Sequence, residues 1–184
     1  MNKLKQLTGY HQGILYAIGY SDGNRVIVRS IDKWYVYTIS EICGNTPYPN
    51  NYYRDRDKTP QWTIKSAKLS IPALADISDW QGFCRAYIEI HGILDTTRGG
   101  KGLRLRIYGS EDVLTAIMEH LPAAPKKLQY ITNSIAGGYT GSTCAIYYQS
   151  SLEVLTIMSW IDGEPKNESV HGRWRKIINK KHSE

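Results

Sequence analysis

The chain has 184 residues, of which 41% are hydrophobic and 22% charged, and its formal net charge is +6. This length allows one compact core, and the composition excludes a disordered chain. The sequence has no run of about 18 apolar residues, so we expect no membrane partner. Its first residues, MNKLKQLTGY, have no apolar segment typical of a secretory signal, which predicts a cytoplasmic protein. The basic charge is compatible with a polyanionic partner.

The three cysteines, Cys43, Cys84 and Cys144, are far apart and have no CxxC spacing. An odd number without such spacing favours neither a disulfide framework nor a zinc site. We therefore expect all three to be reduced and to serve packing.

Two segments, HQGILYAIG (11–19) and CRAYIEIHG (84–92), are predicted as apolar helices that end in glycine. Small residues lie along them at Gly13, Ala17 and Ala86. Such residues let two helix backbones approach closely, so we expect them to form a helix–helix interface.

Matching segments follow in the same order. RVIVRSIDKWYVYTISEI (25–42) matches RLRIYGSEDVLTAIMEHL (104–121), and both predict a strand, a turn and an amphipathic helix. IKSAKLSIPALADI (64–77) matches YQSSLEVLTIMSWI (148–161), and both predict a strand that ends at a serine and is followed by a helix. The matches indicate an internal duplication, and the alternative is coincidence between unrelated α+β segments.

Each predicted repeat has the order helix, hairpin, helix, hairpin, helix (αββαββα). We expect an α+β fold with an N-terminal repeat at 1–78 and a C-terminal repeat with a basic tail at 79–184, together forming one compact unit. A repeat of roughly 75 residues is marginal alone. The two repeats would therefore share a core through their first helices and form a saddle of antiparallel sheets.

These features resemble the LAGLIDADG homing endonucleases in their single-chain, two-repeat form. Residues 11–19 keep the internal glycine, the alanine and the final glycine of the nine-residue signature, and residues 84–92 keep an isoleucine and the final glycine. The tail IMSWIDGEPKNESVHGRWRKI (157–177) is similar to the closing helix, acidic turn and Arg-Lys segment of bacterial members. The resemblance covers nearly the whole chain.

The resemblance implies an acidic residue at the eighth position of each signature, which binds a divalent metal between the scissile phosphates. Here those positions hold Ile18 and His91. Isoleucine has no ligand atom, and histidine is a poor ligand for magnesium. We therefore expect no catalytic residues and no cofactor.

An active nuclease with an atypical Mg²⁺ site is the alternative. Moving the first signature to LYAIGYSDG (15–23) restores an acid at Asp22, and Asp95 occupies the equivalent place in the second repeat. Both aspartates are more simply explained as turn residues. Glu89 with His91 is the other candidate ligand pair, and the simpler interpretation makes Glu89 a helix-face acid and His91 an interface residue.

Strand alternation predicts a basic outward face in each repeat. In the second repeat Leu103, Leu105 and Ile107 would point inward, with arginines between them; in the first, Val26 and Val28 would point inward. The candidate DNA-binding residues on the strands, hairpins and tail are Arg25, Arg29, Arg54, Arg56, Lys65, Arg104, Arg106, Lys126, Lys127, Gln149, Arg173, Arg175 and Lys176. Arginine on such a face can bond phosphates or guanine edges.

The sequence thus predicts a monomeric, sequence-selective double-stranded DNA-binding protein that no longer cuts, of the kind a phage or mobile element uses as a regulator. Three alternatives remain open at this stage. They are the active metal-dependent endonuclease, an intron RNA maturase, and an inhibitor that uses its basic face to bind an acidic host protein.

Overall fold

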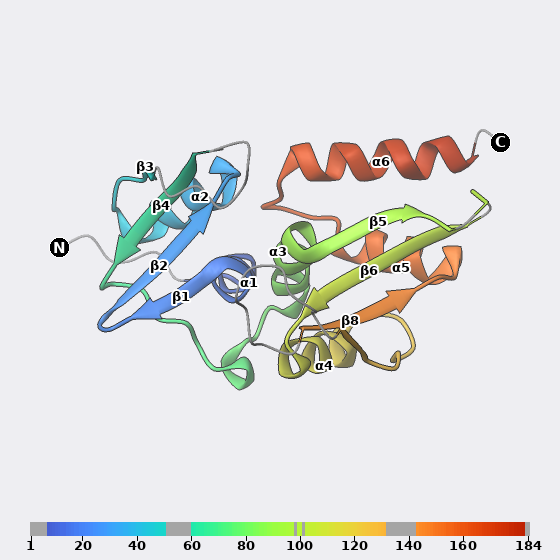
Figure 1. The fold of residues 1–184 in the computed structure, drawn as a ribbon, viewed down its shortest axis with the longest axis horizontal. Coiled ribbons are helices and arrows are strands. Elements are labelled where there is room, and N and C mark those ends of the chain that lie inside the picture. Colours follow the sequence, from blue (N-terminus) through green and yellow to red (C-terminus); the bar gives the residue numbers. More distant parts are fainter. Residues whose placement is uncertain (1–6, 51–59, 98, 101, 132–142, 183–184) are drawn as a thin grey trace. The chain divides into compact units, whose positions relative to one another are not determined.

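The computed structural model describes residues 7–50, 60–97, 99–100, 102–131 and 143–182, except for the side chains of 181–182 (Figure 1). The chain divides into two compact α+β units, Met1–Tyr87 and Ile88–Glu184. The division falls inside helix α3 (Trp80–His91), whereas the predicted repeat boundary, between residues 78 and 79, lies just before this helix.

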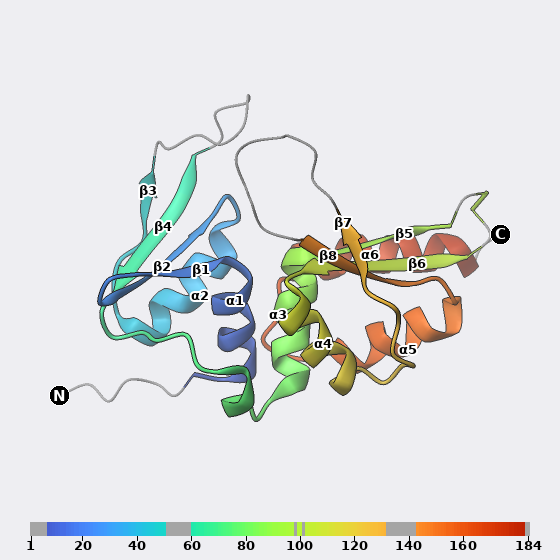
Figure 2. The same cartoon turned by 60° about the horizontal axis from the view of Figure 1, so that its bottom comes forward.

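The first unit contains a four-stranded antiparallel sheet in the order β1-β2-β4-β3. Its elements are α1 (Gly9–Ile18), β1 (Gly19–Asp22), β2 (Arg25–Ser30), α2 (Lys33–Cys43), β3 (Tyr48–Asn50), β4 (Gln61–Ser66) and the short 3-10 helix η1 (Leu74–Asp76). Helices α1 and α2 contact the sheet strands and cover one face of the sheet (Figure 2).

The second unit begins inside α3 and contains a sheet with the order β5-β6-β8-β7, which is the same topology. Its elements are β5 (Gly92–Thr96), β6 (Leu103–Gly109), α4 (Glu111–His120), β7 (Gln129–Ile131), β8 (Thr143–Tyr148), α5 (Ser151–Ile161) and α6 (Glu168–His182). Helices α4 and α5 cover one face of this sheet (Figure 2), and α6 contacts β5. The predicted duplication of an α+β repeat is confirmed.

The third helix predicted for the first repeat is wrong. The segment after β4 forms only the three-residue η1, whereas the matching segment of the second repeat forms the eleven-residue α5. Pro72 lies inside the predicted helix, where it removes a backbone donor and its ring collides with the preceding turn. The apolar spacing in this segment therefore did not indicate a helix.

The two signature helices begin earlier than predicted, and each ends one residue before its predicted final glycine. Helix α1 ends at Ile18, and Gly19 is already the first residue of β1. The alternative register, which needs Gly19 in the middle of a helix, is therefore wrong. Asp22 instead precedes the tight turn between β1 and β2, where Gly23 has φ +58°.

Helices α1 and α3 approach closely within the first unit. A Cβ atom added at Gly13 would collide with the backbone carbonyl of Phe83 and lie 2.9 Å from the Cβ of Ala86. A Cβ atom at Gly82 would lie 2.8 Å from the backbone nitrogen of Tyr10. Glycine at these positions lets the backbones meet without side chains between them. Ala17, the third expected interface residue, is half-buried in α1.

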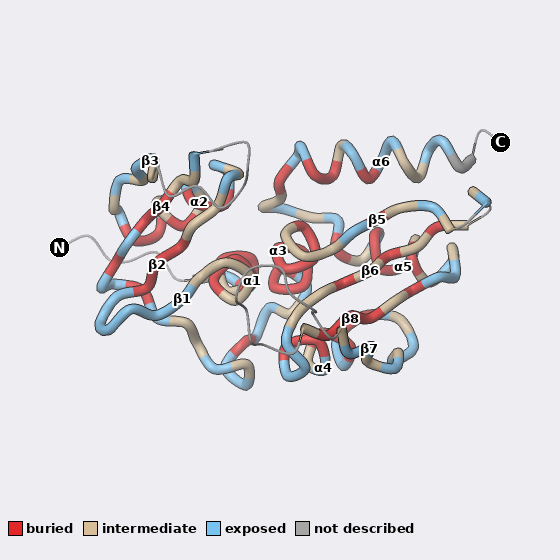
Figure 3. The backbone as a smooth tube through the Cα atoms, in the orientation of Figure 1, coloured by how far each residue is buried: buried red, intermediate tan, exposed pale blue. Residues whose placement is uncertain are grey.

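Each unit has its own apolar core between sheet and helices (Figure 3). In the first unit Val28, Ile64 and Ile39 are fully buried. In the second, Leu105 and Ile107 of β6 and Leu114 of α4 are fully buried. In the part of the chain that the structure describes, no helix is both long and apolar enough to cross a membrane.

Candidate nucleic-acid interface

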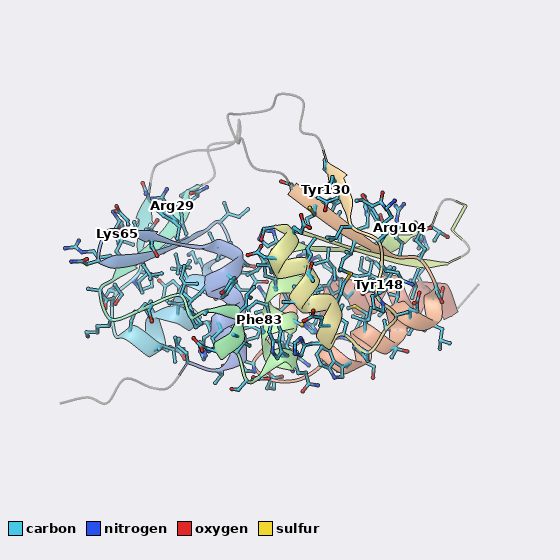
Figure 4. All side chains as sticks on the ribbon, turned by 90° about the horizontal axis from the view of Figure 1, so that it is seen from below. Arg29, Lys65, Phe83, Arg104, Tyr130 and Tyr148 are labelled. Atoms are coloured by element: carbon cyan, nitrogen blue, oxygen red, sulfur yellow. The ribbon has the colours of Figure 1, made fainter. Side chains whose placement is uncertain are left out.

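Strand β6 separates apolar from basic side chains by strict alternation. Leu103, Leu105 and Ile107 are at most 1% exposed, whereas Arg104 and Arg106 are partly exposed. Figure 4 shows Arg104 on the side of the sheet away from the helices. The predicted inward and outward faces of this strand therefore match the burial in the structure.

Asp95 of β5 lies opposite Arg104 in the strand register and binds both arginines. Its Oδ1 accepts a hydrogen bond from Arg104 Nε at 2.8 Å, and its Oδ2 accepts bonds from Arg104 Nη2 at 2.8 Å and Arg106 Nη2 at 2.6 Å. The hydrogen bond from Arg104, with the positive charges of both guanidinium groups, holds the pKa of Asp95 below its ordinary value. The same hydrogen bond raises the pKa of Arg104. Asp95 is thus a mid-strand charge partner and not a turn residue.

Tyrosines extend this outward face on both sides of Arg106. The hydroxyl of Tyr108 accepts a hydrogen bond from Arg106 Nη1 at 3.4 Å, and Tyr147 of β8 is the cross-strand partner of Arg106. Neither tyrosine was predicted as a site residue. The strand periodicity that identified Arg104 and Arg106 places both tyrosines on the same face.

The outward face of the first unit is also basic, with one exception to simple alternation. Arg25 and Lys65 are exposed, and the guanidinium of Arg29 lies 5.9 Å from the ring centre of Tyr20. Ile27 lies between Arg25 and Arg29 on the same face but is only 2% exposed. Its cross-strand neighbours are Tyr20 and Lys65, whose long side chains lie on its two sides.

The strand registers define which residues of the two repeats are equivalent. Gly19 pairs with Val28 in the first sheet, and Gly92 pairs with Ile107 in the second, so Arg25 is equivalent to Arg104. Asp22, paired with Arg25, is equivalent to Asp95 by the same registers.

The predicted equivalence of Lys65 and Gln149 is wrong. Val28 pairs with Ile64, and Ile107 pairs with Ile146, so the counterpart of Lys65 is Tyr147. Gln149 lies just beyond β8, where it is exposed. The alignment of the last strand was two residues off, a shift that leaves the inward and outward pattern unchanged.

The two signature positions carry no acid. Ile18 and His91 are the last residues of α1 and α3, each directly before the first glycine of a strand. Within the described residues, no group of three or more His, Cys, Asp or Glu side chains could hold a metal ion. Asp22 is exposed in its hairpin. Neither helix end therefore has a carboxylate at its signature position.

Glu89, the other candidate ligand, serves the packing of α6. Its side chain is completely buried, and its Oε1 is 2.8 Å from His171 Nε2 and accepts a hydrogen bond from the backbone N–H of Asn167 at 3.2 Å. The side chain of Asn167 in turn accepts a bond from the backbone N–H of Ser169. Glu89 thus ties α3 to the first turn of α6 and does not face solvent.

The remaining predicted residues have varied surroundings. Lys126 belongs to the helix side of the sheet, because its Nζ lies 2.6 Å from Glu153 of α5 and 5.4 Å from the ring centre of the buried Tyr148. Arg175 binds Glu168 at 2.7 Å. Exposed positions are occupied by Lys127, Arg173 and Lys176. Arg54 and Arg56 lie outside the described residues.

Comparisons with known proteins identify the fold. No protein-family model and no curated protein matches the sequence. Among solved structures, the chain is similar to the N-terminal LAGLIDADG domain of DUF199/WhiA, with a TM-score of 0.59 and 12% identity over 92% of this chain and 89% of that one. The homing endonuclease I-GzeII, solved in complex with its DNA target, has a TM-score of 0.60 and 10% identity, over 96% of this chain and 92% of that one.

The full-length DUF199/WhiA from Thermatoga maritima has a TM-score of 0.60 and 13% identity, and the chain spans 63% of its length. Identities this low establish shared architecture and not shared activity. The chain therefore has the two-repeat LAGLIDADG fold.

Proposed function

We propose that the chain binds double-stranded DNA through the outward faces of its two sheets and does not cut it. The observation that carries the proposal is the basic face that each sheet presents on the side opposite its helices. A fold assigned at low identity gives only the architecture, so the chemistry of these faces has to support the function.

Both faces fit the chemistry of duplex DNA. Arg25 and Lys65 in the first unit are exposed cations that can neutralise phosphates. Arg104 and Arg106 in the second unit project from a strand, and a β-ribbon can enter the major groove. Two of the similar structures, I-GzeII and I-SmaMI, were solved with their DNA targets, which supports duplex DNA as the partner class.

The absence of cleavage is proposed from the side chains at the signature positions. Two-metal phosphodiester hydrolysis needs oxygen ligands that hold hard cations beside the scissile phosphates. Ile18 offers no ligand atom, and the carboxylate of Glu89 is engaged by His171 and Asn167. We therefore propose a binding protein, such as a regulator, that works without bound magnesium.

The binding experiment compares matched charge removals in titrations of a labelled mixed-sequence duplex, followed by fluorescence anisotropy. Arg25→Gln and Arg104→Gln should each weaken binding, and together they should weaken it further. Lys33→Gln is the control, because Lys33 lies on the helix side of the first sheet, 4.3 Å from the ring centre of Trp62. Equal weakening by the control, or none by the face variants, would refute the proposed surface.

Two further assays separate this proposal from the alternatives. Structured RNA and duplex DNA of equal length should compete unequally, with the duplex preferred; preference for RNA would favour a maturase. Supercoiled plasmid DNA with Mg²⁺ or Mn²⁺ should stay uncut. Cleavage that Asp22→Asn abolishes would revive the nuclease interpretation.

A further inference from the structure

The cluster formed by Asp95, Arg104 and Arg106 is more than a basic patch, because an acid lies at its centre. The carboxylate of Asp95 receives three N–H groups from the two arginines, and the net charge of the cluster is only +1. A surface that only neutralised phosphates would gain nothing from this carboxylate, since its charge repels the DNA backbone.

The geometry of the pair leaves one edge of Arg104 available for recognition. Asp95 binds the side edge of the guanidinium, through Nε and Nη2, in a bidentate pair. A guanidinium has five N–H donors in a fixed plane, so the end edge formed by Nη1 and the second hydrogen of Nη2 keeps its donors. That edge presents two N–H donors, which can bind O6 and N7 of guanine in the major groove.

The position of Arg104 suits this role. Its side chain is 31% exposed and lies on the outward face of the sheet (Figure 4). The bidentate bond fixes the plane of the guanidinium before any ligand arrives, which lowers the entropy that binding would cost. A freely rotating arginine would instead bond phosphates and bases alike.

The first unit provides an internal comparison. Asp22 and Arg25 are the equivalents of Asp95 and Arg104, but both are exposed beside the hairpin turn, and the structure, which describes both, joins them by no ion pair. Arg25 therefore has no partner there that fixes its plane. The two repeats differ in this respect although their strands have the same register.

We propose that Arg104 reads a guanine in the major groove and that Asp95 is the positioning residue that orients it. This inference rests on the proposed DNA-binding function and deepens it. Arg25 and Lys65 of the first unit serve phosphate contacts, so the second unit supplies sequence selection at this position.

The test begins with selection of preferred duplexes from a randomised pool by the wild-type protein. Each guanine of the selected site is then replaced by 7-deazaguanine, which lacks only the N7 acceptor. In a second set of duplexes, each G·C pair is replaced by A·T. One guanine should emerge whose replacement weakens binding by about 5- to 150-fold, the range for one bidentate base contact. Selection without any enriched guanine overturns the proposal.

Variants then separate positioning from charge. Arg104→Lys keeps the positive charge but loses the planar guanidinium with its paired N–H donors. The preference for guanine over other bases at that position should therefore vanish, while binding to non-specific duplex is kept. Asp95→Ala should also lose discrimination, yet leave non-specific affinity equal or higher, because a negative charge is removed. Asp22→Ala is the matched control and should raise affinity for all duplexes with discrimination intact.

The outcomes distinguish this inference from the function on which it rests. If Asp95→Ala and Asp22→Ala both raise affinity and both keep discrimination, the cluster contacts phosphates only and the inference is wrong. If Asp95→Ala fails to fold, discrimination by Arg104→Lys decides the matter. A wild-type protein that binds no duplex at any salt concentration overturns the DNA-binding function as well.

Discussion

Glycine-to-alanine substitutions at Gly13 in α1 and at Gly172 in α6 should change the stability of the protein in opposite directions, because only Gly13 lies where two helices approach closely. At Gly13 a new Cβ would collide with the backbone carbonyl of Phe83 and lie 2.9 Å from Ala86 Cβ. At Gly172 in α6, the nearest atom to a new Cβ is the flexible end of Arg175, at 4.0 Å. Gly13→Ala should therefore destabilise the protein, whereas Gly172→Ala should stabilise it.

The magnitudes follow from two opposing terms. Alanine is better than glycine in a helix by about 1 kcal/mol, and this gain applies at both positions. Overpacking costs about 1–3 kcal/mol, and at Gly13 it falls at the high end because a backbone carbonyl has to move. We expect a net loss of about 1–2 kcal/mol for Gly13→Ala and a gain of about 0.5–1 kcal/mol for Gly172→Ala.

Urea unfolding followed by circular dichroism measures both values. For a chain of this size, 1 kcal/mol corresponds to a change in Tm of about 2–4 °C, so a thermal melt provides a second measurement. The double variant Gly13→Ala/Ala86→Gly should be no more stable than Gly13→Ala, because the carbonyl of Phe83 remains and glycine at position 86 itself costs about 1 kcal/mol in the helix. Stabilisation by Gly13→Ala equal to that by Gly172→Ala would refute the close helix contact.

Three further predictions concern buried and paired groups. Glu89→Ala leaves Nε2 of the buried His171 without its carboxylate partner and should lower the free energy of unfolding by about 1–3 kcal/mol. Faster hydrogen exchange in the first turn of α6 would locate the effect, and unchanged stability and exchange would contradict it. The pKa of Asp95 is lowered in the folded state, so the stability that its ion pair contributes is fully present above the unfolded-state pKa and is lost as the pH falls through the folded-state pKa. The difference in unfolding free energy between wild type and Asp95→Asn should therefore be constant between about pH 7 and 5 and shrink below about pH 4. A difference that grew in acid would refute the ion pair. Burial raises the pKa of the Cys84 and Cys144 thiols, and the charges of nearby acids add to this; iodoacetamide at about pH 8 should label neither until urea unfolds the chain, as mass spectrometry would detect.

Periodicity was the most informative feature of the sequence. Alternation along β6 separated Leu105 and Ile107 from Arg104 and Arg106, because only one face of this sheet is covered by helices. The same rule does not predict the burial of Ile27, which lies on the outward face between its cross-strand partners Tyr20 and Lys65, because these partners come from other segments of the sequence.

Alignment of the repeats was accurate where a short helix-to-strand junction fixed it. The equivalence of Arg25 and Arg104 follows because each signature helix runs directly into a strand, at Gly19 and at Gly92, and that strand pairs with the one that carries the arginine. The last strand was misaligned by two residues, because its period of two makes such a shift invisible in the apolar pattern. Pro72 explains why the third helix of the first repeat does not form, because proline disrupts a helix even where the spacing of the apolar residues favours one.

The role of Asp95 could not be predicted from the sequence. An aspartate near glycine and threonine residues is typical of a turn, and only the strand register shows that it lies opposite Arg104. The helix contact was predicted in part. Gly9 and Gly82 stand four residues before Gly13 and Ala86, so the repeat extends through GYHQG and GFCRA, a match that lengthens the helix interface toward both N-termini.

The most direct test of the account is the salt dependence of duplex binding by the wild type and by the Arg25→Gln/Arg104→Gln double variant. Anisotropy titrations in EDTA between about 50 and 200 mM salt give log K against log salt, whose slope counts the phosphates that the protein neutralises. We expect tight binding without metal, a steep negative slope for the wild type, and a slope reduced by about 1 for each lost phosphate contact. Binding that needs Mg²⁺, or affinity that salt and the double substitution leave unchanged, would contradict the account.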